Sequence, residues 1–344
     1  MSSPAATLHY PIEHAPAAGS TVEVAPGVRW LRMPLPFALD HINLWLIEDG
    51  EGWTAVDSGI DREEVRQHWE TIFGHHLDGR PIRRLVVTHF HPDHLGLAHW
   101  LCASLDIPVF MTQGEYLTAW AVSEDIGSYS GATMRELFRR HGLAEDRIEA
   151  LERRGNAYKR GVPALPARYE RLIDGDELAI GGRSWRVMVG YGHAPEHAAL
   201  YCASLGVLIS GDMVLPRIST NVNVSTASPG GDSLGLFLAS LRRYAGLPED
   251  TLVLPSHGRP FRGLQARVEQ LAAHHAERCD ALLAACGEPL SAWELVPTLF
   301  PRELDTHQVM FAMGEAIAHL NHLEHGQRIR RVGEDDVIRY VRIH

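Results

Sequence analysis

The chain has 344 residues, of which 45% are hydrophobic, and a formal net charge of −11 at pH 7. This length favours one large catalytic domain with a smaller appended unit, and the sequence lacks the run of about 20 apolar residues that a membrane-spanning helix needs. The negative charge disfavours non-specific nucleic-acid binding, which depends on neutralising phosphates with Lys and Arg.

The beginning of the chain and its cysteines indicate a compartment. The first eight residues, MSSPAATL, lack the basic and apolar regions of a secretion signal. The four cysteines do not show Cys-x-x-Cys spacing, which argues against a thiolate metal site or a dense disulfide framework; they are Cys102, Cys202, Cys279 and Cys286. A reducing cytoplasm is therefore the expected location.

Strands and helices are predicted to alternate in the first third of the chain. Short apolar runs predict strands at residues 28–33, 43–47 and 108–111, with a hairpin turn at 49–50. Asp61 is predicted to cap a helix that ends near Phe73, and a second helix is predicted over residues 95–105. This alternation predicts a layered α/β architecture.

A cluster of three histidines and one aspartate follows the apolar run Leu85-Val86-Val87 and reads THFHPDH over residues 88–94. Imidazole and carboxylate together suit a borderline divalent ion such as zinc, and a loop leaving a strand can aim alternate side chains at one point. So many polar groups at one strand end would otherwise need partners to offset their burial. We therefore expect a metal site here.

Four further apolar runs also end at a turn that carries His or Asp. The residues at these ends are Asp57, then His193 and His197, then Asp212, and finally His257. Ligand sites gather on loops at strand ends. The five ends are therefore expected to meet at one edge of a sheet arrangement.

The order of these residues resembles the metallo-β-lactamase superfamily. The match consists of His-x-His-x-Asp-His, then Gly-His, then Gly-Asp, then a late His, over about residues 25–262. The resemblance implies an α/β fold, a four-layer αββα sandwich, with a dinuclear metal site on its edge. It implies one metal held by His89, His91 and His193, another held by Asp93, His94 and His257, and Asp212 bridging both. It also implies that Asp57 orients a ligand imidazole.

The chemistry of such a site agrees with this ligand set. Two cations a few ångströms apart need a shared anionic ligand and acidify a trapped water, which gives a nucleophile at neutral pH. Asp212, as the bridge, and Asp93, assisting proton transfer, are the expected catalytic carboxylates. Two zinc ions are the expected cofactors, although iron and manganese occur with these ligands in similar folds.

Variation within the motif favours acyl chemistry. Class B1 β-lactamases have Cys at the position of Asp212 and class B3 enzymes lack Asp there, so the chain is more similar to glyoxalase II, lactonases and phosphodiesterases. Diiron flavoproteins of this fold carry Glu where this chain has His91. We expect hydrolysis of a small-molecule thioester, lactone or related ester. The alternatives are a metal-dependent ribonuclease or phosphodiesterase, and a non-catalytic nucleic-acid-binding regulator.

Residues near the metal motifs are candidates for binding the substrate. Glu196 replaces the second Gly of the common Gly-His-x-Pro-Gly-His pattern, and a solvated turn residue is the favoured interpretation. In relatives His197 often faces the substrate; a structural hydrogen bond is the alternative. Arg217, Ser219 and Asn221 follow the bridging aspartate closely. Arg217 is suited to a substrate carboxylate or phosphate, unless it forms a surface ion pair.

Residues 1–262 are expected to form the catalytic domain, with a helical insertion over about 113–166. In the resembling family, insertions at this point commonly lie over the metal site. A lid is one interpretation, and a helical pair that only packs on the sandwich is the other. Periodicity does not separate them.

Residues 263–344 are expected to form a second unit. It contains a predicted helix over 264–286, a capping box at 291–294, a helix that Asp305 opens, and a two-stranded hairpin with an acidic turn at 334–336. Helices followed by such a hairpin resemble a winged-helix domain, found at the carboxyl end of a subgroup that includes a ribonuclease. The acidic turn favours packing, or the formation of a homodimer, over nucleic-acid binding.

Overall fold

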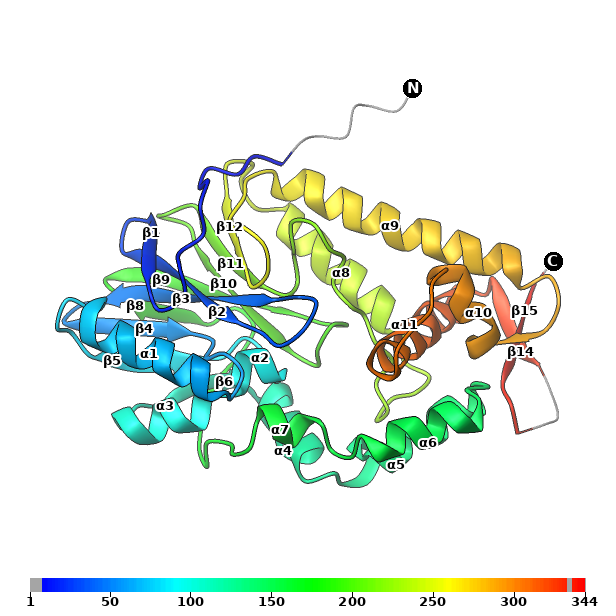
Figure 1. Ribbon diagram of the computed structural model, residues 1–344. Coiled ribbons are helices and arrows are strands. Elements are labelled where there is room, and N and C mark those ends of the chain that lie inside the picture. Colours follow the sequence, from blue (N-terminus) through cyan, green and yellow to red (C-terminus); the bar gives the residue numbers. More distant parts are fainter. Residues whose placement is uncertain (1–7, 333–335, 344) are drawn as a thin grey trace.

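The computed structural model describes residues 8–332 and 336–343. Two large β-sheets pack face to face, and helices cover their outer faces, while a small third sheet lies among the C-terminal helices (Figure 1). The opening segment 1–7, and Glu334 and Asp335 of the predicted acidic turn, lie outside the described residues. None of the helices in the described part of the chain combines the length and apolar composition that a membrane crossing requires.

The first sheet is formed by the N-terminal half of the chain. Its strands, in spatial order, are β1 (Thr21–Ala25), β2 (Val28–Pro34), β3 (His41–Asp49), β4 (Gly52–Val56), β5 (Ile82–Val86), β6 (Val109–Thr112) and β7 (Glu170–Leu172). The strands from β1 to β4 pair antiparallel, and those from β4 to β7 pair parallel. Parallel neighbours need a crossover connection, and α1 (Glu63–His75) and α3 (Ala98–Leu105) provide two of them.

The second sheet follows in the sequence. Its spatial order is β12 (Leu252–Pro255), β11 (Val207–Gly211), β10 (His197–Cys202), β9 (Arg183–Gly190) and β8 (Glu177–Ile180). Helix α8 (Ser233–Ala245) connects the parallel strands β11 and β12. Helix α9 (Leu264–Ala285) lies beside α8, so this sheet also has a helical outer layer (Figure 1).

Apolar side chains fill the space between the sheets and both outer layers. Trp30 and Trp45 of the first sheet stack with their ring centroids 6.2 Å apart and share a core with Trp185 of the second sheet. Trp69 of α1 is fully buried against the outer face of the first sheet. Burial of such surface stabilises a fold by about 25 cal/mol per Å². The structure therefore confirms the predicted αββα sandwich.

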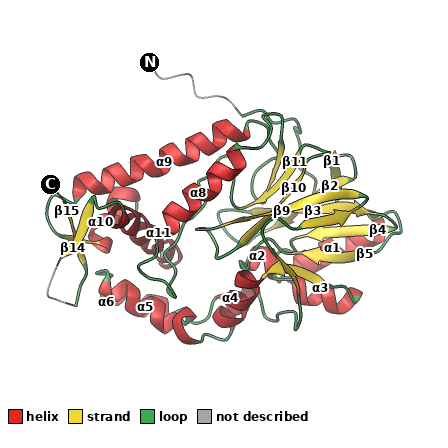
Figure 2. Ribbon diagram, turned by 180° about the vertical axis from the view of Figure 1, so that it is seen from behind, coloured by secondary structure: helices red, strands yellow, loops and turns green. Residues whose placement is uncertain are grey.

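The predicted insertion and the C-terminal unit lie on the same side of the sandwich (Figure 2). The insertion contains α4 (Gln113–Ser123), the 3₁₀ turn η1 (Gly127–Tyr129), α5 (Gly131–Arg140), α6 (Glu145–Arg153) and α7 (Tyr158–Gly161). The C-terminal unit adds α10 (Ala292–Leu299), α11 (Thr306–His325), β13 (Leu290–Ser291), β14 (Ile329–Val332) and β15 (Arg339–Arg342). One apolar core runs from the second sheet through α8 and α9 into α10 and α11, and α5 and α6 pack on it.

One local prediction was wrong and two were incomplete. Asp61 does not cap α1, because the helix begins at Glu63 and the Asp61 carboxylate instead accepts a 2.8 Å bond from Arg66. The helix predicted over 95–105 begins three residues later, as α3, and the short helix α2 (Pro92–Leu95) precedes it. They are separated near Gly96, whose backbone lies so close to neighbouring chain segments that a Cβ would overlap them. The predicted terminal hairpin is present, because β14 and β15 pair antiparallel, and β13 adds a third strand beside β15.

Candidate metal centre

The five predicted strand ends do meet at one edge of the sandwich. Asp57 follows β4, His89 follows β5, His193 follows β9, Asp212 follows β11 and His257 follows β12. Apart from Asp57, these residues and the other histidines and the aspartate of the THFHPDH segment form three overlapping groups, and within each group the ligand atoms lie within 4.8 Å of one another. The topology thus gathers residues that lie up to two hundred positions apart in the sequence.

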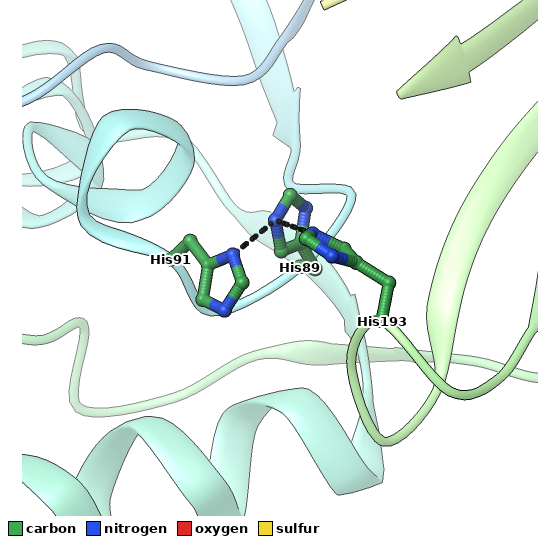
Figure 3. A group of neighbouring side chains, drawn as sticks. All are labelled: His89, His91 and His193. Atoms are coloured by element: carbon green, nitrogen blue, oxygen red, sulfur yellow. Dashed lines mark hydrogen bonds between the residues drawn. The ribbon is translucent and has the colours of Figure 1, made fainter. Parts of the chain in front are cut away.

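The first group consists of three imidazoles (Figure 3). Nε2 of His89 lies 2.9 Å from Nδ1 of His91 and 3.2 Å from Nε2 of His193. Burial and the adjacent His193 lower the pKa of His91 to about 3, and burial also lowers the pKa of His89 well below its usual value. Neutral imidazoles whose nitrogens converge are the form that binds a metal.

The second group combines a carboxylate with two imidazoles. Oδ2 of Asp93 lies 3.4 Å from Nε2 of His257 and 3.7 Å from Nε2 of His94. Both imidazoles are buried, whereas the side chain of Asp93 is 20% exposed. Asp93 is therefore the member of this group that has access to solvent.

Asp212 lies between the two groups. Its Oδ2 is 3.5 Å from Nε2 of His193, and its Oδ1 is 3.6 Å from Nε2 of His94 and 3.4 Å from Nε2 of His257. Oδ1 of Asp212 and Nε2 of His94 are buried and have no hydrogen-bond partner. An unsatisfied buried polar group costs about 1–3 kcal/mol, and a cation between these atoms would remove that cost. The residues therefore fit a pair of metal ions.

Asp57 holds His94 in place. Its carboxylate accepts bonds from the Thr88 amide at 2.7 Å, the Thr88 hydroxyl at 2.9 Å and Nδ1 of His94 at 2.8 Å. Burial lowers the pKa of His94, but the carboxylates of Asp57, Asp93 and Asp212 raise it to about 9. Asp57 has a φ of 63°, a conformation that costs energy for a residue other than Gly and that clusters at functional sites.

Backbone carbonyls orient two further imidazoles. Nδ1 of His257 donates to the carbonyl of His41 at 2.8 Å, and Nδ1 of His193 donates to the carbonyl of Asn221 at 2.7 Å. Each bond leaves Nε2 free to face the centre, which is how histidine ligands are usually fixed. The imidazole of His41 also accepts from the Gly258 amide at 3.0 Å. Nothing in the sequence distinguishes His41, because it orients His257 through its backbone carbonyl.

Glu115 of α4 was also missed. It is fully buried, and its carboxylate accepts from the Phe90 amide at 2.9 Å and the Glu196 amide at 2.6 Å. Burial raises its pKa to about 7, although both amide bonds oppose that change. Glu196 in turn accepts from the Gly114 amide at 2.7 Å, so its interpretation as a solvated turn residue was wrong. Nothing in the helical pattern of α4 distinguishes Glu115.

The four candidate substrate contacts have different surroundings. His197 is fully buried and accepts from the Asp212 amide at 3.1 Å, so the structure favours the structural alternative for this residue. Arg217 is exposed and Ser219 is half-buried. The side chain of Asn221 donates to Glu315 of α11 at 3.0 Å instead of facing the centre.

Comparisons with known proteins agree with this geometry. Residues 38–257 match the model of the metallo-beta-lactamase superfamily, and residues 279–343 match a metallo-beta-lactamase-like C-terminal domain. A crystal structure of a beta-lactamase domain protein from Burkholderia ambifaria is 52% identical, with a TM-score of 0.90 and 98% of each chain covered.

Two curated relatives are hydrolases by name. The probable metallo-hydrolase YqjP of Bacillus subtilis is 26% identical over 90% of this chain and 95% of its own length. A hydroxyacylglutathione hydrolase of Chromohalobacter salexigens is 32% identical over 36% of this chain and 45% of its own length. The chain belongs to the metallo-beta-lactamase superfamily and is a metallo-hydrolase of that superfamily.

Proposed function

We propose that this protein uses two zinc ions to hydrolyse a small-molecule thioester, lactone or related ester. The observation that carries the proposal is the position of Asp212, whose two carboxylate oxygens face different groups of ligands. A carboxylate in this position suits a pair of ions, because two nearby cations need a shared anionic ligand. Iron or manganese is the alternative metal, since the same donors bind them in similar folds.

When bound, such a metal pair supplies a Lewis acid and an acidified water at neutral pH. The side chains then have separate tasks. Asp57 holds the proton on Nδ1 of His94, so that Nε2 keeps its lone pair. Burial raises the pKa of Asp93, but His94 and His257 lower it to about 2, so its partly exposed carboxylate is charged at neutral pH. Asp93 is our candidate for assisting proton transfer, because it is the carboxylate of the centre that has most access to solvent.

Two considerations support acyl chemistry. The Gly-Asp motif at Asp212 resembles that of glyoxalase II and the lactonases, and a segment of a hydroxyacylglutathione hydrolase that matches 36% of this chain is 32% identical. The exposed guanidinium of Arg217 remains our candidate for binding a substrate carboxylate or phosphate, with Ser219 beside it. We propose no membrane or nucleic-acid partner; a homodimer formed through the C-terminal unit is part of the proposal.

The test is metal analysis of the purified protein, combined with a hydrolysis screen over thioesters, lactones, β-lactams, phosphodiesters and short RNA. We expect two transition-metal ions per chain and turnover of an ester or thioester that stops on chelation and returns with zinc. A stoichiometry that stays at one in excess zinc would contradict the dinuclear proposal. Cleavage of RNA alone would contradict the substrate class.

Substituting three arginines near the C-terminus tests whether the protein hydrolyses an ester or cleaves RNA. Arg328 pairs with Asp280 at 3.0 Å and Arg331 pairs with Glu324 at 2.9 Å, so two of the three cations at 328, 330 and 331 already have carboxylate partners. Neutralising all three should leave ester turnover within a few-fold of wild type. If they bound RNA, each lost phosphate contact would reduce the slope of log affinity against log salt by about one.

A further inference from the structure

Asn221 connects the metal centre to the C-terminal unit. Its carbonyl accepts from Nδ1 of His193, which fixes the tautomer of that imidazole and leaves Nε2 facing His89 and Asp212. Its side-chain amide donates to Oε2 of Glu315 at 3.0 Å. A single residue thus contacts a ligand imidazole through its backbone and helix α11 through its side chain.

Glu315 is itself held by Arg278 of α9. The carboxylate is buried, and its Oε1 lies 3.2 Å from Nη2 of Arg278. The guanidinium of Arg278 lies over the ring of Phe300, 4.5 Å from its centroid. Glu315 is buried and the side chain of Arg278 is only 15% exposed, and an ion pair largely removed from water is often no more stabilising than apolar residues of the same volume. A role in positioning accounts for the pair better than a role in stability.

The backbone of α11 also touches this segment. The Val224 amide donates to the carbonyl of Gly314 at 3.1 Å, and a Cβ at Gly314 would overlap Asn223. At its other end, the segment is fixed by a 2.5 Å bond from the Thr220 hydroxyl to the carbonyl of Asp212. The stretch between the bridging aspartate and residue 224 is therefore held by the metal centre on one side and by α11 on the other.

We propose that Glu315 and Arg278 are positioning residues for His193, acting through Asn221. The C-terminal unit then contributes to one of the two metal sites, the one formed by His89, His91 and His193, and not to the other. This inference rests on the proposed metal pair. Helices α9 and α11 of the C-terminal unit would thus support metal binding, although neither helix carries a candidate ligand.

The experiment measures the stepwise zinc affinities of Asn221→Ala, Glu315→Ala and the double variant by competition with a chromophoric chelator. We expect one of the two zinc ions to bind roughly ten- to a hundredfold more weakly in each variant, as for other residues that orient histidine ligands. The double variant should lose no more than the stronger single variant, because the two residues act as one unit. In a His193→Ala background, Glu315→Ala should leave the remaining zinc unchanged.

The matched control is Asp280→Ala, which removes a surface ion pair from α9, the helix that carries Arg278, and should leave both affinities unchanged. Glu315→Gln keeps an acceptor for Asn221 and should bind both zinc ions nearly as wild type, which distinguishes positioning from misfolding. Equal weakening of both ions, or a lowered melting temperature with unchanged affinities, would overturn the inference. A wild-type protein that binds no metal would overturn the proposed function as well.

Discussion

Two clusters of buried histidines occur in this molecule, and they are built differently. In the second cluster, between α9 and α11, Nδ1 of His275 lies 3.1 Å from Nε2 of His319, and Nδ1 of His319 donates to the carbonyl of Glu315 at 2.8 Å. These imidazoles form a chain of donors and acceptors that ends on the backbone. In the metal centre, by contrast, the nitrogens of several imidazoles point toward one another and toward the carboxylates of Asp93 and Asp212.

The difference shows that buried imidazoles alone do not define a metal site. Within the described ranges, 8–332 and 336–343, the groups of three ligand atoms close enough to share an ion all lie in the first cluster. The carboxylate of Glu315, whose backbone carbonyl accepts from His319, pairs with Arg278 and Asn221 instead. A cation site therefore differs from a packed core in having carboxylates and imidazole nitrogens whose lone pairs point to one place. The presence of histidines is not enough.

The largest effect should come from removing Asp212, because carboxylates distinguish the metal centre from the second histidine cluster. We expect Asp212→Ala, and likewise His94→Ala, to lower kcat by about a thousandfold or more, since each removes a principal electrostatic element. Folding should persist, because the sandwich core does not include these residues. Turnover and circular dichroism measured together test this. Near-normal turnover with two metals bound would show that the assigned ligand is wrong.

A smaller effect should follow from changing how an imidazole is held. In the wild-type protein Nδ1 of His94 donates to the Asp57 carboxylate at 2.8 Å. In Asp57→Asn the side-chain amide would place a second donor opposite that nitrogen. Asn tolerates the φ of 63°, so the backbone should not change. We expect zinc affinity to fall by about ten- to a hundredfold at the site that contains His94. Unchanged affinity, measured by chelator competition, would contradict the orienting role of Asp57.

The smallest effect concerns acid stability of the second cluster. Burial and His319 lower the pKa of His275 to about 3, and burial lowers the pKa of His319 to about 4. Both pKa values lie below that of the unfolded chain, so the stability they contribute is present above about pH 6.5 and is lost as the pH falls toward 4. The free energy of unfolding of metal-free protein should decrease by about 1–2 kcal/mol per histidine between pH 7 and 5.

Urea unfolding at the two pH values measures this change. The matched variant is His275→Gln, which keeps a donor toward His319 but does not titrate. Its stability should depend less steeply on pH than that of wild type. Identical slopes for the two proteins would contradict the assignment of a neutral, buried imidazole at position 275.

The sandwich, and the gathering of the candidate ligands at one edge of it, were predictable because their signals are local in the sequence. Each candidate ligand lies in the short segment that directly follows an apolar run, so strand ends and chemistry appear together, as in the THFHPDH segment. Contacts that depend on tertiary packing left no such signal. Glu115 and Asn221 reach their partners across the fold, and the Asp61 cap failed because an ion pair with Arg66 competes for the carboxylate.

Glu115 and Glu196 each accept a hydrogen bond from a backbone amide in the other's segment, and this pairing limits which substitutions the family can accept at either position. Glu115 binds the Glu196 amide while Glu196 binds the Gly114 amide, so the start of α4 and the loop that carries His193 are joined in both directions. Losing one carboxylate would leave buried amides without acceptors. Positions 115 and 196 should therefore covary among homologues, and a chimera that exchanges the insertion will need both residues from the same parent.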